Sequence, residues 1–345
     1  MLIARAPVRI SLAGGGTDLE AYYSRFGGAV VSATIDKYFY VLVSHSRGDD
    51  IQVSSSDYRT FFRHRVEAPP PWDGDLGLPR AILQHFGMRT GLSVFLASQV
   101  PPGTGLGSSS TVAVALIKAM SVLSGRNLSR HEIAALACEI EIDRLGMPIG
   151  KQDQYAAAFG GLNYIEFRPD HVSVERLSVS EEVEFQLQRR LLLFFTGLAH
   201  NSASILREQR QNSCDERHPT VDALHQIKEI AIETRERLLG GEIAAVGDLL
   251  HRSWVAKRTL ARGISDPTID RWYEVALDGG AEGGKLVGAG GGGFLLLYCE
   301  PERQDALCGR LDDEGLIRMD FDFESNGGTV IMNNLVGWQP MATRA

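Results

Sequence analysis

Apolar and polar residues alternate along this chain with the spacings of strands and amphipathic helices, and one stretch organises the rest. The continuous apolar run Val94–Ala97 predicts a buried strand. Apolar residues at positions 112, 115, 116, 119, 120 and 123 then follow the spacing of one helical face. Between them lies Pro101–Thr111, in which three alternating glycines precede three serines. The pattern therefore predicts a strand, a glycine loop and a helix.

The remainder of the first hundred residues is patterned mainly as strands. The elements expected there are a strand over Leu2–Leu12 interrupted by Pro7, a short helix over Leu19–Phe26, a hairpin formed by Ala29–Ile35 and Phe39–Ser44, and a helix over Leu78–Phe86. Residues 47–75 instead carry charged stretches and consecutive prolines at 69–71. We expect an irregular, exposed excursion in that region.

Helical patterns are more frequent in the rest of the chain. A helix over Ser129–Leu145 is expected to start with a capping box, because Glu132 follows Ser129 by three residues. The later elements expected are helices over Tyr155–Phe159, Ser204–Leu239 with a break at Pro219, Glu242–Ala261, Pro267–Leu277 and Pro301–Glu314, and strands over Leu162–Phe167, Val172–Leu177, Leu191–Phe195, Phe294–Tyr298 and Ile317–Phe323. A change of domain is expected near residues 178–190, which gives domains at 1–180 and 181–345.

Composition narrows the class of protein. The 345 residues are 44% hydrophobic and 23% charged, so a packed core is expected. A net charge of −8 argues against a nucleic-acid partner, which requires a basic face. The four cysteines form no Cys-x-x-Cys pair, which is typical of reduced thiols. The first residues lack the apolar stretch of a signal peptide and no 18-residue apolar run exists, so a cytoplasmic protein without a membrane partner is expected.

The glycine loop before the expected helix is suited to binding an anion. Its glycines allow positive φ angles and a close approach to a ligand, and its serines lie where unpaired N–H groups and the helix dipole attract phosphate. A plain Gly/Ser turn with a helix cap is the alternative. The loop is not a Walker A motif, because no Gly-Lys-Ser/Thr follows at the required spacing. The candidate phosphate-binding residues are Pro101, Gly103, Thr104, Gly105, Leu106, Gly107, Ser108, Ser109 and Ser110.

Two further glycine clusters lie on either side of this loop. The segments Arg5–Asp18, Pro101–Thr111 and Lys285–Gly293, in this order, resemble the three motifs of the GHMP kinase superfamily. The resemblance implies an α+β fold of two domains, a ribosomal-protein-S5-like N-terminal domain and a ferredoxin-like C-terminal domain. It also implies an active site in the cleft between them, with ATP and Mg²⁺ as cofactors.

Two short motifs point within this superfamily. Gly-Gly-Gly-Thr-Asp-Leu at 14–19 and Gly-Lys-Gln-Asp-Gln at 150–154 most resemble the sugar 1-kinases acting on D-glycero-D-manno-heptose 7-phosphate. This implies ATP-dependent phosphorylation of the anomeric hydroxyl of that sugar phosphate, in the synthesis of nucleotide-activated heptose for capsule or surface polysaccharide. A kinase for an unphosphorylated sugar such as L-fucose is the alternative, and a catalytically silent sugar sensor is a third reading. The oligomeric state is left open, a homodimer included.

The resemblance also implies roles for individual residues. Ser109 and Glu141 correspond to the magnesium-binding pair, and Glu141 is chosen over its acidic neighbours by its distance from Gly146, Gly150 and Asp153. A solvated helix carboxylate is the alternative for Glu141. Asp153 corresponds to the catalytic base, with a helix cap as the alternative. Arg9 corresponds to the arginine beside the base and the phosphate. The presence of Ser109, Glu141 and Asp153 speaks against the silent sensor.

The sugar is expected to bind at the first and third glycine clusters. Thr17 and Asp18 match a sugar-binding Thr-Asp, although an Asx-turn that only shapes the loop is the alternative for Asp18. Galactokinases have Glu-His where this chain has Gly15 and Gly16, which leaves room for a larger sugar. The other substrate-binding candidates are Lys151, Gly290 and Gly291. Further candidate cations for binding a sugar phosphate, which the sequence does not rank, are Lys37, Lys257 and Arg258.

Overall fold

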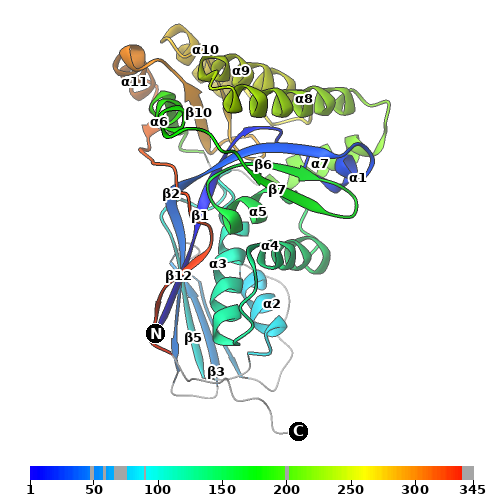
Figure 1. The fold of residues 1–345 in the computed structure, drawn as a ribbon, viewed down its shortest axis with the longest axis vertical. Coiled ribbons are helices and arrows are strands. Elements are labelled where there is room, and N and C mark those ends of the chain that lie inside the picture. Colours follow the sequence, from blue (N-terminus) through cyan, green and yellow to red (C-terminus); the bar gives the residue numbers. More distant parts are fainter. Residues whose placement is uncertain (47–49, 57–59, 66–75, 89–90, 199–201, 336–345) are drawn as a thin grey trace.

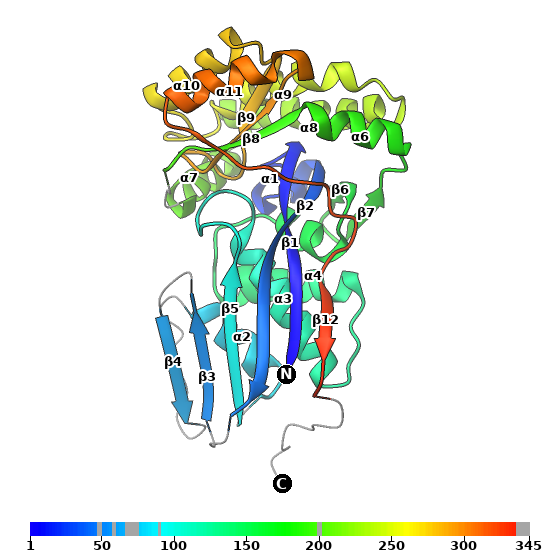
Figure 2. The ribbon, with the colours of Figure 1, turned by 90° about the vertical axis from the view of Figure 1, so that its left-hand side faces the viewer.

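The structure is a computed structural model that describes residues 1–46, 50–56, 60–65, 76–88, 91–198 and 202–335. It contains two sheets, each covered by helices. Figure 1 shows the larger sheet with α2, α3 and α4 in the lower part and the helices α8 to α11 above. Figure 2 shows strands β1, β2 and β5 in front of α3, so the helices cover one face of the larger sheet.

The larger sheet has eight strands among the described residues. Its main path runs in the order β12-β1-β2-β5-β3-β4, and β6 joins β2 and carries β7. The strands are β1 (Leu2–Ala13), β2 (Gly28–His45), β3 (Asp50–Ser55), β4 (Thr60–Arg65), β5 (Leu92–Ser98), β6 (Leu162–Phe167), β7 (Val172–Arg176) and β12 (Thr329–Asn333).

The hairpin predicted at Asp36–Tyr38 is wrong, because β2 is one continuous strand. β1 pairs along both halves of β2 and holds them in line. Between Pro7 and Arg9, two steps along β1 correspond to four along β2, from Tyr38 to Thr34. The extra residues of β2 are absorbed as an irregularity in the ladder and not as a turn. β1 likewise passes through Pro7 without ending.

The irregular excursion predicted for residues 47–75 is corrected in part. Residues 50–55 and 60–65 form β3 and β4, an antiparallel pair at the end of the sheet. β3 also pairs in parallel with β5, and its Ile51 and Val53 are buried in the core. This long-range pairing outweighs the local charge and proline signals. Residues 47–49, 57–59 and 66–75 lie outside the described part of the chain.

The helices on the larger sheet follow the predictions closely. They are α1 (Glu20–Phe26), α2 (Gly77–His85), α3 (Ser108–Leu123), α4 (Arg130–Cys138) and α5 (Gln152–Phe159). Ser129 and Glu132 form the expected capping box before α4. The single helix predicted up to Leu145 changes character at Glu139, because Glu139–Arg144 is a π-helical turn. Such turns widen a helix by one residue and often accompany functional sites.

The smaller sheet has the order β11-β8-β10-β9. Its strands are β8 (Leu191–Phe195), β9 (Gly283–Leu286), β10 (Phe294–Tyr298) and β11 (Ile317–Arg318). Its helices are α6 (Glu181–Arg190), α7 (Ser202–Cys214), α8 (Pro219–Leu239), α9 (Val246–Lys257), α10 (Pro267–Asp278) and α11 (Gln304–Asp313), with short 3-10 turns at Ile243–Ala245 and Pro301–Arg303. The break at Pro219 is confirmed, while the edge strand predicted over Ile317–Phe323 is only two residues long.

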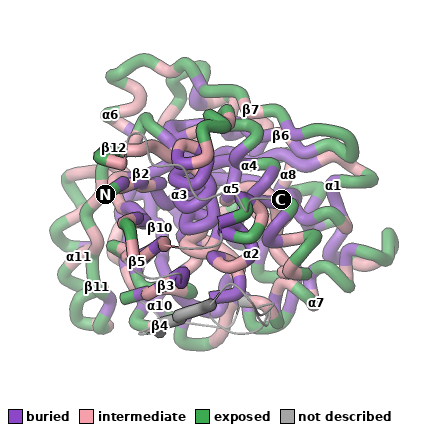
Figure 3. Tube along the Cα trace, turned by 90° about the horizontal axis from the view of Figure 1, so that it is seen from below, coloured by how far each residue is buried: buried purple, intermediate pink, exposed green. Residues whose placement is uncertain are grey.

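One hydrophobic cluster crosses the junction between the two sheets. Val8 and Ile10 of β1 and Leu106 of the glycine loop pack in the same cluster as Leu193 of β8 and Phe294 of β10. Figure 3 shows buried residues around α3 and β2, with exposed residues toward the rim; the buried residues of α3 belong to a separate cluster on the larger sheet. β12, from near the end of the chain, adds to the sheet of the first half by pairing with β1. The division at residue 180 remains a prediction.

No helix in the part of the chain that the structure describes is both long and apolar enough to cross a bilayer.

Candidate active site

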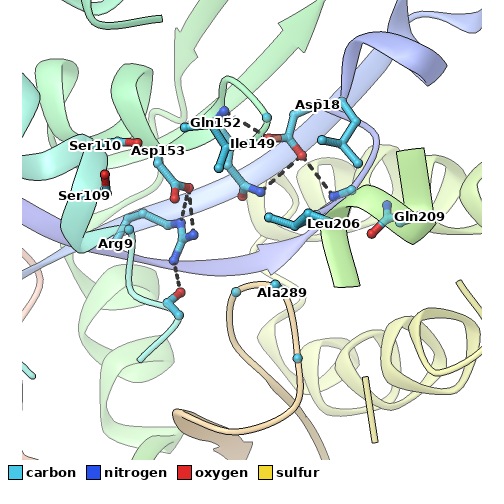
Figure 4. A pocket seen from close by; sticks show the side chains of 18 of the residues that line it. Arg9, Asp18, Ser109, Ser110, Ile149, Gln152, Asp153, Leu206, Gln209 and Ala289 are labelled. Carbon is cyan, nitrogen blue, oxygen red and sulfur yellow. Dashed lines mark hydrogen bonds and ion pairs between the residues drawn. The ribbon is translucent and has the colours of Figure 1, made fainter. Parts of the chain in front are cut away.

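The three glycine motifs meet around one pocket at the junction of the two sheets (Figure 4). Its wall is built from the loop after β1, the loop before α3, the turn before α5, helix α7, the end of α9 and the segment between β9 and β10. The lining residues are Arg9, Gly15, Gly16, Asp18, Leu19, Gly103, Thr104, Gly105, Gly107, Ser108, Ser109, Ser110, Ile149, Gly150, Gln152, Asp153, Leu206, Gln209, Lys257, Leu260, Gly288, Ala289, Gly290 and Gly292.

The loop before α3 presents its main chain to this pocket. Gly103, Gly105 and Gly107 all have positive φ, and Gly107 caps α3 without any side-chain hydrogen bond. The first N–H groups of a long helix therefore lack a side-chain partner, which is the arrangement that attracts an anion. The alternative, a plain Gly/Ser turn with a helix cap, shares this geometry, so phosphate binding by the loop remains a prediction. Ser108 adds a buried Oγ with no hydrogen-bond partner.

Not every residue of the predicted loop faces the pocket. The Thr104 hydroxyl donates to the Pro101 carbonyl 2.8 Å away and so shapes the turn. Leu106 is fully buried in the cluster between the two sheets. Pro101 and Leu106 are not among the lining residues, so in this structure they support the loop from behind.

Asp153 and Arg9 form an ion pair at the centre of the pocket. Arg9 Nε lies 2.8 Å and Nη2 lies 2.7 Å from Asp153 Oδ1. Arg9, only 3% exposed, also donates to the Gly105 carbonyl and so ties the base of the pocket to the glycine loop. The helix-cap alternative for Asp153 is wrong, because the residue at the cap of α5 is Lys151 and Asp153 instead faces Arg9. Figure 4 shows this pair beside Ser109.

Glu141 lies fully buried beside Ser109. Ser109 Oγ donates to Glu141 Oε1 at 3.0 Å, and Gln154 Nε2 donates to Oε2 at 2.7 Å. Burial raises the Glu141 pKa to about 7, against the opposing effect of these hydrogen bonds. The alternative of a solvated carboxylate is therefore wrong for Glu141. It does describe Glu139 and Asp143, which are exposed on the same π-helical turn.

Asp18 links the first glycine cluster to the turn before α5. Its carboxylate accepts from Gly16 N at 2.9 Å, from Gln152 N at 3.1 Å and from Gln152 Nε2 at 3.2 Å. Burial, and then the charge of Asp153, raise the pKa of Asp18. A Cβ on Gly150 would stand 1.8 Å from Asp18 Oδ2, so a glycine is required there. These hydrogen bonds are the ones expected if Asp18 only shapes the loop. A contact between Asp18 and a sugar remains a prediction.

Thr17 and Lys151 lie outside the pocket lining. The fully buried Thr17 hydroxyl bonds to the Gly14 and Ala29 main chain, so it holds the loop against β2. Lys151 Nζ lies 5.0 Å from the centre of the Tyr23 ring and not toward Asp153, its neighbour in sequence.

Among the other candidate cations, Lys257 is the one that lines the pocket. It is 6% exposed, and its Nζ donates to the carbonyls of Leu286 and Gly288. Lys37 pairs with Asp36, and Arg258 pairs with Asp270. Burial, Lys285 and Arg9 together lower the Lys257 pKa well below its usual value. Lys285, also buried, was not foreseen as a charged neighbour.

The third glycine cluster closes the pocket on the side of the smaller sheet. Gly290 lines it, and a Cβ on Gly290 would stand 2.8 Å from Ile264 Cα. Gly291 is not among the lining residues, and its N–H donates to the Ile264 carbonyl at 2.9 Å. Sequence reasoning missed Leu206 and Gln209, because nothing in the pattern of α7 signals that it reaches the glycine loops.

This fold and site define a class of protein. The GHMP kinases N-terminal domain family matches residues 77–161 and the GHMP kinases C-terminal family matches residues 223–315. A D-glycero-alpha-D-manno-heptose 7-phosphate kinase of Campylobacter jejuni is 33% identical over 94% of this chain and 96% of its own length. The chain therefore belongs to the GHMP kinase family.

Two other relatives show how much of the chain this similarity covers. The crystal structure of a D-glycero-D-manno-heptose 1-phosphate kinase from Bacteroides thetaiotaomicron superposes with a TM-score of 0.80 at 28% identity, covering 96% of this chain and 99% of that one. A bifunctional fucokinase/GDP-fucose pyrophosphorylase of Arabidopsis thaliana is 30% identical over 67% of this chain but only 22% of its own length. The similarity to the two heptose phosphate enzymes thus extends over 94% and 96% of this chain.

Proposed function

We propose that this protein is an ATP-dependent sugar kinase that phosphorylates the anomeric hydroxyl of D-glycero-D-manno-heptose 7-phosphate. The product is the 1,7-bisphosphate, on the route to nucleotide-activated heptose for capsule or surface polysaccharide. The observation that carries the proposal is that the paired Arg9 and Asp153 line the same pocket as Ser109, whose hydroxyl donates to the buried Glu141 behind it, and that three glycine motifs form this pocket. The names of the heptose phosphate kinases reported above support the choice of sugar.

The glycine loop binds the phosphates of ATP in this proposal. The uncapped N–H groups at the start of α3 point positive charge toward the pocket, and the Ser108 hydroxyl is buried there without a partner. A phosphate oxygen satisfies both. The loop thus neutralises part of the negative charge that builds up as the terminal phosphoryl group is transferred.

Asp153 orients the attacking hydroxyl and accepts its proton. The sugar oxygen forms a bond to the terminal phosphorus, the bond from that phosphorus to the bridging oxygen breaks, and ADP leaves. The proton of the hydroxyl passes to the Asp153 carboxylate. Arg9 holds this carboxylate on its Oδ1 side and is available to stabilise charge on the transferred group.

The residues beside the loop fit a magnesium ion. Mg²⁺ prefers hard oxygen ligands and retains several waters, so a hydroxyl and a carboxylate suffice. Ser109 and Glu141 supply these, and the raised pKa of the buried Glu141 is what an uncompensated carboxylate near a cation site is expected to have. Held by Ser109 and Glu141, a Mg²⁺ ion would offset the negative charge of the ATP phosphates.

Turnover of a panel of sugars tests the proposal. The protein is incubated with ATP, Mg²⁺ and one of D-glycero-D-manno-heptose 7-phosphate, the corresponding 1-phosphate, L-fucose or D-galactose, and ADP release is followed. We expect the highest kcat/KM with the 7-phosphate, and phosphorus NMR should show a new phosphate on the anomeric oxygen. Preferred turnover of L-fucose would favour the alternative, a 1-kinase for an unphosphorylated sugar. Preferred turnover of the 1-phosphate would mean that the protein adds the second phosphate at position 7 of a sugar already phosphorylated at position 1.

A further inference from the structure

The pocket wall contributed by α7 contains a glutamine whose amide nitrogen has no hydrogen-bond partner among the residues that the structure describes. Gln209 lines the pocket and is only 3% exposed. Its Nε2 is buried and makes no hydrogen bond to any described residue. A buried amide N–H without an acceptor is costly, and such groups are rare in folded proteins. Because the side chain faces a pocket, a ligand atom is the natural acceptor.

A second unpartnered amide atom lines the same pocket. Gln152 Nε2 donates to the Asp18 carboxylate at 3.2 Å, which sets the orientation of the amide and leaves Gln152 Oε1 as the free end. This oxygen is buried and accepts no hydrogen bond within the described part of the chain. The pocket therefore presents one unpaired donor from α7 and one unpaired acceptor from the turn before α5. A hydroxyl group, which both accepts and donates, complements such a pair.

Gly15 and Gly16 lie between these two amides. A Cβ on Gly16 would stand only 2.6 Å from Gln209 Nε2, and a Cβ on Gly15 would stand 3.7 Å from Gln152 Nε2. Gln209 thus occupies the space that a side chain at position 16 would need. Figure 4 shows Gln209 and Leu206 on α7 across the pocket from Gln152 and Asp18.

We propose that Gln209 and Gln152 bind hydroxyl groups of the sugar acceptor and so determine which sugar is accepted. Gln209 Nε2 donates to a sugar oxygen, and Gln152 Oε1 accepts from a sugar hydroxyl. The inference rests on the proposed function in that the acceptor is a sugar. It adds that α7, far from the three glycine motifs in sequence, supplies a specificity residue.

The decisive variant is Gln209→Leu, which keeps the size of the side chain and removes both polar atoms. Its matched control is Gln211→Leu on the exposed side of the same helix. Both are compared with the wild type using the best sugar of the panel and its monodeoxy analogues. We expect Gln209→Leu to lower kcat/KM for the sugar by about 10- to 100-fold, with KM for ATP unchanged.

The deoxy analogues separate recognition from a structural effect. Removing the hydroxyl that Gln209 binds should cost the wild type and Gln211→Leu about the same 10- to 100-fold. Gln209→Leu should lose almost nothing further on that analogue. Equal losses for all three proteins on every analogue, or a Gln209→Leu enzyme as active as Gln211→Leu, would overturn the inference.

Two further outcomes have a defined meaning. Should Gln209→Leu not fold, Gln209→Glu, which keeps an acceptor but removes the donor, is expected to show the same loss, and full activity of this variant would contradict the proposal. A wild-type protein that uses no sugar would end the proposed function and the inference with it. An active wild type with an unaffected Gln209→Leu variant would end the inference alone.

Discussion

Gly105 and Gly288 lie in main-chain contact, since a Cβ on Gly288 would stand 2.3 Å from the Gly105 Cα. A Cβ on Gly105 would in turn stand 2.3 Å from the Val287 carbonyl oxygen. The glycine loop before α3 and the glycine cluster of the second half therefore touch without any side chain between them. This contact closes the base of the pocket and sets the distance between its two walls.

Because of this contact, we expect Gly105→Ala to lower the free energy of unfolding more than the same substitution at a glycine with open space around it. Gly125→Ala is the matched control, because Gly125 also has a positive φ but has nothing within 4 Å of its added Cβ. Both variants carry backbone strain of about 1–2 kcal/mol. We expect Gly105→Ala to lower the free energy of unfolding by about 1–3 kcal/mol more than Gly125→Ala, because the added methyl group forces the two loops apart. Urea unfolding measures the difference, and equal losses would exclude a tight contact.

The ion pair at the pocket centre predicts a large effect of Asp153→Asn. We expect kcat to fall by about 10²- to 10⁴-fold, because the amide cannot accept the hydroxyl proton. KM for ATP should change little, since the glycine loop before α3 is unaltered. Asp143→Asn, at an exposed acid of the π-helical turn, is the control and should retain activity. Wild-type turnover by Asp153→Asn would exclude Asp153 as the base.

If Glu141 binds Mg²⁺, the ion should raise the Tm of the protein in a pH-dependent way, which can be measured without an activity assay. The folded pKa of Glu141, about 7, lies above the usual 4.5, so without metal the folded state binds more protons between these values and the free energy of unfolding falls as pH rises through them. Mg²⁺ should compensate the ionised carboxylate and raise Tm more at pH 8 than at pH 5. Glu141→Gln should abolish this difference. A Tm gain from Mg²⁺ that is the same at both pH values would argue against the site.

The buried Lys285 should make the free energy of unfolding rise with pH, which is opposite to the effect of Glu141. Burial, and then the charge of Arg9, lower the pKa of Lys285 to about 7 from 10.5. Between these values the unfolded state binds more protons, so the free energy of unfolding should rise with pH, by at most about 1.4 kcal/mol per pH unit for this group. Lys285→Met should flatten the rise measured by urea unfolding between pH 7 and 9. An unchanged slope would mean that Lys285 keeps its charge.

The elements that were predicted well depend on local signals. The Ser129–Glu132 capping box, the break at Pro219 and the alternating glycines before α3 act over a few residues. The errors involve partners distant in sequence. β2 stays straight at Asp36–Tyr38 because β1 lies along both of its halves, and β3 is a strand because β5 pairs with it.

By itself, the sequence determined the three glycine motifs and their order, because backbone freedom is a property of a short stretch of chain. The resemblance of its residue spacing to the GHMP kinases is what singled out Glu141 and Asp153. Only the tertiary structure decided which side chains reach the pocket. It turned Lys151 onto Tyr23, buried Lys257 under the third glycine cluster and brought Gln209 beside Gly16. The direction of a side chain and its burial depend on elements packed from elsewhere in the chain, which no local pattern records.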